Sequence, residues 1–150
     1  MSGVLGTDVL CQIAIVVRDI EKARRDYKEI LGLEFSATSL TDGYDKSHAT
    51  YRGKATSARA KLAFAQLGPG VSMELIEPVG GPSTWQEFLD AGGEGVHHVA
   101  FNVKGMEGIL SALGEKGVET VQRGDYTGGR YAYADGQEKL GVILELLENL

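Results

Sequence analysis

The alternation of apolar and polar positions predicts one series of elements that occurs twice along the chain. Residues 12–17 are rich in β-branched side chains, which favours a strand. After Asp19, apolar side chains recur at helical spacing over residues 20–31. Residues 98–103 repeat the length and rhythm of the first strand, and an amphipathic helix over 106–113 follows at the same offset. The chain therefore contains the beginnings of two similar modules.

The closing parts of the two modules also match. In the first, a predicted strand over 60–67 is followed by a Gly-Pro-Gly turn and a strand over 71–77. In the second, predicted strands cover 131–134 and 142–148, with an Asp-Gly turn after the first of them. The last strands contain the corresponding segments MELIE and LELLE. Matched strands and helices in the same order indicate an internal repeat of a βαβββ unit.

We expect an α+β fold in which the two βαβββ modules form a cup-shaped, half-open β-barrel with the helices outside. All 150 residues are assigned to a single domain. Its predicted parts are module one at about 9–78, a linker helix at about 82–92 and module two at about 95–149. Ser83 or Thr84 is predicted to cap the linker helix, which packs on the core through its aromatic side chains.

Strand periodicity predicts which side chains face the inside of the cup, because successive side chains point to opposite faces. Gln12 and Ala14 share one face of the first strand, and His98 and Ala100 share the equivalent face of its repeat. The other face carries the larger apolar side chains, which we expect to pack on the helices. The cup is then lined by the polar first residue and the alanine of each strand, and the alanines leave space there.

Two glutamates, Glu74 and Glu145, occupy equivalent positions inside the apolar closing strands. A buried carboxylate is costly unless it is paired or bound to a metal. With Gln12 and His98, the two carboxylates form a mixed oxygen and nitrogen ligand set that neutralises a divalent charge. We therefore predict that Gln12, Glu74, His98 and Glu145 bind one divalent metal ion. Zinc, nickel, cobalt and manganese all suit this set.

The same periodicity assigns other polar residues to the outside of the cup. Glu77 and Glu148 lie three positions after Glu74 and Glu145, so they point to the other face of their strands and are expected on the solvent face. His97 is expected to face away from His98 and to serve in packing or hydrogen bonding.

Composition narrows the function classes. The chain has a formal net charge of −6, which argues against a nucleic-acid partner because phosphate binding needs a basic surface. A single cysteine excludes an intrachain disulfide and suits a reducing cytosol. No signal-peptide pattern begins the sequence, and no apolar run is long enough to span a bilayer. We expect a cytoplasmic protein without a membrane partner.

Several motifs together resemble the vicinal oxygen chelate superfamily, which includes glyoxalase I, methylmalonyl-CoA epimerase, extradiol dioxygenases, and fosfomycin and bleomycin resistance proteins. The motifs are QIAIVV at 12–17 with Asp19, LGL at 31–33, ELIEP at 74–78, GVHHVA at 95–100 and LEL at 144–146. The stretches ELIEP, PST, GVHH and TGGR are most similar to methylmalonyl-CoA epimerases. The resemblance implies the same four metal ligands, and it implies a homodimer.

The chain departs from the epimerase pattern at the metal site. Those enzymes usually have His where this chain has Gln12, and often Gln where it has Glu74. The ligand set found here is closer to some glyoxalase I enzymes. Epimerases also commonly place an acidic residue near the strand at residue 60, and residues 55–59 contain none. An iron-dependent dioxygenase is disfavoured because Gln12 replaces one of the two histidines that such a site needs.

Both leading activities share the removal of a proton next to a carbonyl group. We expect Glu145 to act as the principal base and Glu74 to return a proton from the opposite face, while the metal stabilises the negative charge on the enolate oxygen. Return to the same carbon gives an epimerase acting on an acyl-CoA such as methylmalonyl-CoA. Return to the neighbouring carbon gives a lactoylglutathione lyase. A protein that binds a drug without catalysis is the alternative outside the enzymes.

Basic side chains between residues 42 and 61 predict contact with an anionic substrate, either a small thioester or a thiol adduct. Arg130 is a second candidate for this contact, and tyrosines of the closing strands are candidates for lining the cup. The expected substrate-binding residues are Arg59, Arg130 and Tyr133.

Overall fold

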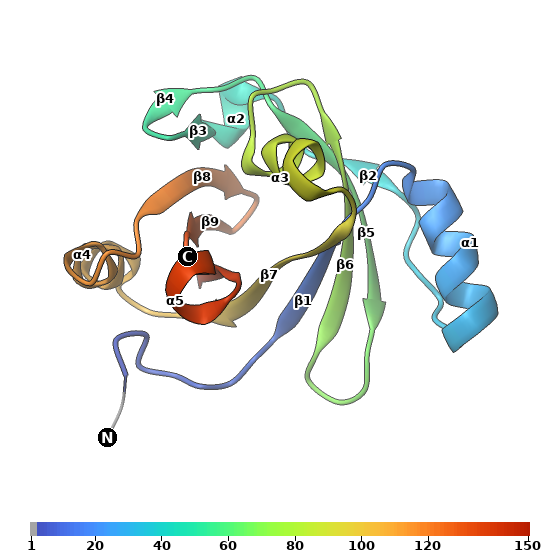
Figure 1. Cartoon of the computed structure of the whole chain (residues 1–150), viewed down its shortest axis with the longest axis horizontal. Coiled ribbons are helices and arrows are strands. Elements are labelled where there is room, and N and C mark those ends of the chain that lie inside the picture. The colour runs from blue at the N-terminus through green and yellow to red at the C-terminus, as the bar shows by residue number, and fades with distance from the viewer. Residues whose placement is uncertain (1–2) are drawn as a thin grey trace.

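A computed structural model describes residues 3–150 and places all ten strands of this part of the chain in one sheet, which curls into a half-open barrel (Figure 1). The strands are β1 (Gln12–Val16), β2 (Ser39–Leu40), β3 (Thr50–Tyr51), β4 (Lys54–Ala55), β5 (Arg59–Gln66), β6 (Ser72–Val79), β7 (Gly95–Asn102), β8 (Thr120–Tyr126), β9 (Gly129–Ala134) and β10 (Ile143–Asn149). The helices are α1 (Ile20–Leu31), α2 (Tyr44–Ser47), α3 (Thr84–Gly92), α4 (Met106–Glu115) and α5 (Gln137–Leu140).

The predicted α+β fold with its internal repeat is confirmed. The strand order is β2-β5-β6-β1-β7-β10-β9-β8-β3-β4. Each module pairs its first strand in parallel with its last, β1 with β6 and β7 with β10. The modules meet where β1 and β7 pair antiparallel, so their strands form one continuous sheet rather than two separate ones. The centre of this sheet therefore consists of the first and last strands of both modules.

The helices begin, end and pack as the sequence pattern predicts. Asp19 caps α1 by accepting a hydrogen bond from the backbone N–H of Lys22, and Gly32 ends the helix in a left-handed conformation. Helices α1 and α4 cover the outer face of the sheet on opposite sides of the molecule (Figure 1). Ser83 caps α3, which packs Trp85 against residues of the cup interior. No helix within residues 3–150 is long and apolar enough to cross a membrane.

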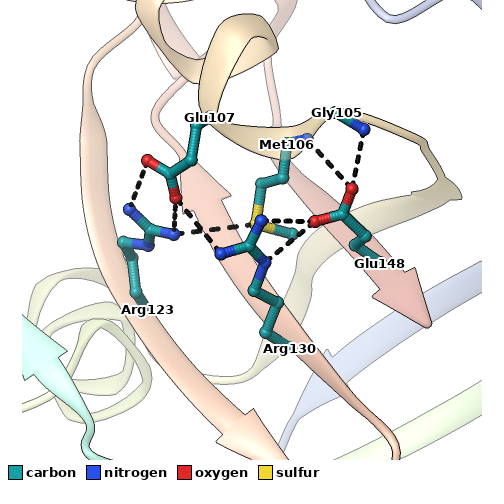
Figure 2. Close-up of polar contacts among 6 residues, drawn as sticks. All are labelled: Gly105, Met106, Glu107, Arg123, Arg130 and Glu148. Carbon is teal, nitrogen blue, oxygen red and sulfur yellow. Dashed lines mark hydrogen bonds and ion pairs between the residues drawn. The ribbon is translucent and has the colours of Figure 1, made fainter. Parts of the chain in front are cut away.

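The expectation that Glu77 and Glu148 merely face solvent was wrong. Both side chains point away from the cup, as the alternation along the strand predicts, but each reaches the first turn of the helix in its own module. Glu77 accepts a hydrogen bond from the backbone N–H of Ile20, and Glu148 accepts from those of Gly105 and Met106 (Figure 2). A carboxylate stabilises a helix N-terminus by satisfying free N–H groups and by opposing the helix dipole. The two glutamates therefore tie α1 and α4 to the closing strands.

Elements that the sequence pattern did not reveal are mostly short. They are β2, β3, β4, α2 and α5, of two to four residues each, together with β8. So few residues carry little periodicity. Strand β8 pairs antiparallel with β9 and places the β8–β9 turn beside the opening of the cup.

Candidate metal centre

Glu74 and His98 lie on either side of Ala14 in the middle of the sheet. Ala14 pairs with Glu74 of β6 on one side and with His98 of β7 on the other. Paired residues of neighbouring strands direct their side chains to the same face. The methyl group of Ala14 leaves space on this face. The longer side chains of Glu74 and His98 can therefore approach each other above it.

The repeat produces a second row of the same kind, with Ala100 at its centre. Ala100 pairs with Gln12 of β1 on one side and with Glu145 of β10 on the other. Both central alanines are fully buried. The four predicted ligands therefore come from four adjacent strands and surround two alanines on the inner face of the cup.

All four side chains are buried, and the polar atoms of His98 and the two glutamates lie close together. His98 Nε2 is 3.2 Å from Glu145 Oε1 and 3.6 Å from Glu74 Oε1. Neither His98 Nε2 nor Gln12 Oε1 has a hydrogen-bond partner. Buried polar atoms are normally hydrogen-bonded, so two unpaired atoms in one cluster need an explanation.

Burial governs the protonation of this cluster. It raises the pKa of Glu145 to about 8, although a hydrogen bond from Tyr133 acts in the opposite direction. Burial, together with the charge of Glu145, holds the pKa of Glu74 well above its ordinary value. Burial lowers the pKa of His98 to about 3, so the imidazole is neutral at physiological pH.

The chemistry of these four groups fits a divalent cation. An amide oxygen, a neutral imidazole nitrogen and two carboxylates all offer lone pairs. Two ligand atoms about 2.1 Å from one ion and at right angles to each other are about 3.0 Å apart, close to the shorter contact of His98. Within residues 3–150, no three His, Cys, Asp or Glu side chains stand together as an assembled metal site. The cluster therefore supplies suitable donors, whose side chains must adjust to bind an ion.

The expectation that His97 faces away from His98 was wrong. The pairing of β1 with β7 shifts between Ala14 and Ile15, and His97 has no partner there. Such an irregularity disturbs the alternation of side chains along a strand. The two buried imidazole rings consequently lie beside each other, with their centroids 5.1 Å apart.

Tyr133 connects the cluster to the linker helix. It accepts a hydrogen bond from Trp85 Nε1 at 3.0 Å, and its influence lowers the pKa of Glu145. Its ring lies 4.7 Å from that of His98, measured between centroids. Tyr133 was predicted to bind substrate, and its side chain lines the cavity above the cluster.

The cavity has a volume of about 510 Å³ and includes Gln12, Glu74 and Glu145 in its lining. Its walls contain aromatic side chains that the sequence analysis did not single out as binding residues, notably Phe64 and Trp85. Other lining residues are Ser39, Leu40, Thr41, Asp42, Ser47, Ala49, Ala58, Leu62, Asp125, Tyr126, Thr127, Tyr131 and Leu147. They come from segments far apart in the sequence, which is why periodicity within single elements does not identify them.

The two arginines predicted to bind substrate are placed elsewhere. Arg130 forms ion pairs with Glu148 and Glu107 beside the start of α4 (Figure 2). Arg59 donates a hydrogen bond from Nε to the main-chain oxygen of Thr41, at 2.8 Å. Neither arginine lines the cavity, so the structure brings only Tyr133 of the three candidates to the cluster.

The sequence and the fold are similar to those of known proteins. The sequence pattern of the glyoxalase/bleomycin resistance protein/dioxygenase superfamily matches residues 11–133. The Bacillus subtilis (strain 168) protein YqjC is 31% identical over 142 residues, covering 93% of this chain and 91% of that protein. The 2-epi-5-epi-valiolone epimerase of Actinomyces sp is 26% identical over 152 residues, covering 97% of this chain and 81% of that enzyme.

A crystal structure of methylmalonyl-CoA epimerase from Mycobacterium tuberculosis has a similar fold, with a TM-score of 0.70 and 21% sequence identity. The match covers 100% of this chain and 92% of that chain. The shared architecture is the curled sheet with helices outside it.

Proposed function

This chain belongs to the glyoxalase/bleomycin resistance protein/dioxygenase superfamily, and we propose that it is a metal-dependent epimerase that removes and returns a proton next to a carbonyl group. The observation that carries the proposal is a buried cluster of four lone-pair donors at a cavity. Similarity to a 2-epi-5-epi-valiolone epimerase, and a fold similar to that of methylmalonyl-CoA epimerase, support this reaction class.

Gln12, Glu74, His98 and Glu145 would hold the cation. A divalent cation in this position acts as a Lewis acid that polarises a carbonyl oxygen. The unpaired, buried Gln12 Oε1 and His98 Nε2 supply neutral ligands, and the two glutamates balance the charge of the ion.

The carboxylates also provide the base. Glu145 lines the cavity together with Tyr133. We expect Glu145 to loosen its contact with the cation and accept the proton of the substrate. Glu74 lines the cavity from β6, on the other side of β1 and β7 from Glu145 of β10, and we expect it to return a proton to the other face of the carbon.

Two alternatives share parts of this site. A lactoylglutathione lyase uses the same proton removal but returns the proton to the neighbouring carbon. A protein that only binds a drug has no need of four buried metal donors. The finer expectation of an acyl-CoA substrate rests on relatives and structural neighbours that act on methylmalonyl-CoA.

Metal content tests the first part of the proposal. We expect elemental analysis of the purified protein, reconstituted with zinc, nickel, cobalt or manganese salts, to find about one divalent ion per chain. The variants His98→Ala and Glu145→Gln should lose it, because the first removes a donor and the second removes a negative charge that balances the ion. Glu138→Gln, at an exposed position of α5, is the matched control and should retain it. Absence of metal from the reconstituted wild-type protein would refute the metal site.

Hydrogen exchange tests the reaction. The metal-loaded protein is incubated in D₂O with carbonyl compounds that carry a hydrogen on the adjacent carbon, and deuterium incorporation is followed by NMR. We expect incorporation at that carbon, with inversion of its configuration, and its loss in Glu145→Gln. Transfer of the proton to the neighbouring carbon of the methylglyoxal–glutathione adduct would instead favour the lyase.

A further inference from the structure

Every charged side chain that lines the cavity is acidic. Within residues 3–150, the charged lining consists of Glu74 and Glu145 in the metal cluster, together with Asp42 and Asp125. A divalent ion balances the two glutamates. Of the two aspartates, Asp125 contacts Nδ1 of the exposed His48 at 3.0 Å, whereas Asp42 forms no ion pair within residues 3–150. A cavity walled by one sign of charge attracts the opposite sign and repels its own. An anionic group entering this cavity therefore meets repulsion.

Three of the five basic side chains that were expected to contact an anionic substrate are engaged outside the cavity, and the other two, Lys46 and Lys54, do not line it. Arg52 contacts Glu87 at 2.8 Å, and Lys61 contacts Glu77 at 3.1 Å. Arg59 donates to a main-chain oxygen. Recognition of a carboxylate or phosphate normally uses a free arginine or lysine, because an unpaired buried charge is costly. The lining of this cavity contains neither residue type.

The other lining residues suit a substrate that carries hydroxyl groups. Asp42 and Asp125 are strong acceptors for alcohol O–H groups. The hydroxyls of Ser39 and Thr127 both donate and accept. Trp85 contributes an aromatic surface for the C–H groups of a ring. A volume of about 510 Å³ suits a small molecule rather than a peptide.

From this lining we propose that the substrate is a small, uncharged carbonyl compound bearing several hydroxyl groups, and not an anionic thioester or thiol adduct. The proposal rests on the proposed function, since it concerns the same cavity. The carbonyl group points toward the metal cluster, and the hydroxyl groups reach the two aspartates. The likeness to an epimerase named for valiolone agrees with this substrate class, although the charge of the lining carries the argument.

Binding measurements test the proposal without requiring catalysis. Trp85 is the only tryptophan and lines the cavity, so its fluorescence reports occupancy. The zinc-loaded protein is titrated with scyllo-inosose, with dihydroxyacetone and its phosphate as a pair that differs in charge, and with methylmalonyl-CoA. We expect saturable binding of the uncharged ketones, with dihydroxyacetone at least about tenfold tighter than its phosphate. Tighter binding of either anion, or no saturable binding of an uncharged ketone, would overturn the proposal.

A charge reversal sharpens the test. Asp42→Lys places a positive charge among the lining residues and should shift the preference toward the phosphate by about tenfold or more. Asp8→Lys makes the same change of net charge at an exposed residue outside the lining and should leave the preference unchanged. An unchanged preference in Asp42→Lys would count against the proposal.

Deuterium exchange on the same samples separates the two proposals. Binding of the uncharged ketone without exchange into it would contradict the epimerase function and leave the substrate class standing. Exchange into methylmalonyl-CoA, with tighter binding of that thioester, would support the epimerase function and overturn the substrate class.

Discussion

His97 Nδ1 lies 2.8 Å from Nδ1 of His98, one of the four proposed metal ligands, and both side chains are buried. One of these nitrogens must carry the proton that joins them. A histidine that binds a cation through Nε2 carries its proton on Nδ1. Metal binding by His98 therefore requires His97 to accept that proton, which makes His97 a positioning residue.

The first prediction concerns this contact. His97→Ala removes the acceptor, so the affinity for zinc should fall by about 10–100-fold. His97→Gln keeps an acceptor oxygen and should recover most of the affinity. Isothermal titration with zinc measures both, with His48→Ala, an exposed histidine outside the cluster, as the control. Wild-type affinity in His97→Ala would show that the contact does not position the ligand.

The second prediction concerns the space above the central alanines. Ala100→Val places a larger side chain between Gln12 and Glu145, so metal binding should be lost. Overpacking also lowers the free energy of unfolding, by about 1–3 kcal/mol. Ala63→Val, equally buried but packed beneath α1, should lose stability and keep the metal. Elemental analysis beside thermal unfolding separates the two effects, and metal retention in Ala100→Val would contradict the site.

The third prediction concerns pH. Because burial raises the pKa of Glu145 in the folded protein to about 8, its proton stabilises the metal-free fold. This contribution is complete below the unfolded value near 4.5 and is lost as the pH rises toward 8. Above pH 6.5, His98 is mostly neutral in both states. Between pH 6.5 and 8, the stability of the metal-free protein should therefore fall, by at most about 1.4 kcal/mol per pH unit for this carboxyl group.

Thermal unfolding of chelator-treated protein measures that slope. Glu145→Gln removes one titrating group and should reduce the slope, with Glu74, whose pKa is also raised, contributing the remainder. Saturating zinc should abolish the slope because both carboxylates are then bound. A midpoint that rises between pH 6.5 and 8 would contradict a raised pKa for this glutamate.

The fourth prediction concerns the ion pairs beside α4. Glu148→Gln weakens the contacts with Arg130 and with the backbone of Gly105 and Met106 (Figure 2). The thermal midpoint should fall, while metal and ketone binding should stay unchanged, since this network lies outside the cavity. Glu77→Gln is the equivalent change at α1 and should behave alike. Altered ligand binding in Glu148→Gln would show that the network influences the cavity.

The sequence by itself determined the repeated modules, the main helices and strands, and the face on which Gln12, Glu74, His98 and Glu145 lie. These features depend on local periodicity, which the order of residues carries directly. Asp19 and Gly32 mark the start and the end of α1 through contacts with residues a few positions away, so the sequence predicts them too. Even so, local alternation misplaced His97, because the irregular pairing of β1 with β7 depends on both strands at once.

Only the tertiary structure decided what surrounds the cluster. The partners of Arg130 come from two other elements, and Asp42 and Asp125 lie 83 positions apart in the chain yet line one cavity. Pairing between strands that are far apart in the chain brings such residues together, and no local sequence pattern predicts this pairing. The sequence predicted contact between the substrate and the basic residues of the segment 42–61, whereas in the fold none of these basic side chains lines the cavity and Asp42 and Asp125 do. The charge of a binding site depends on which side chains remain unpaired within it, and that is a property of the folded chain.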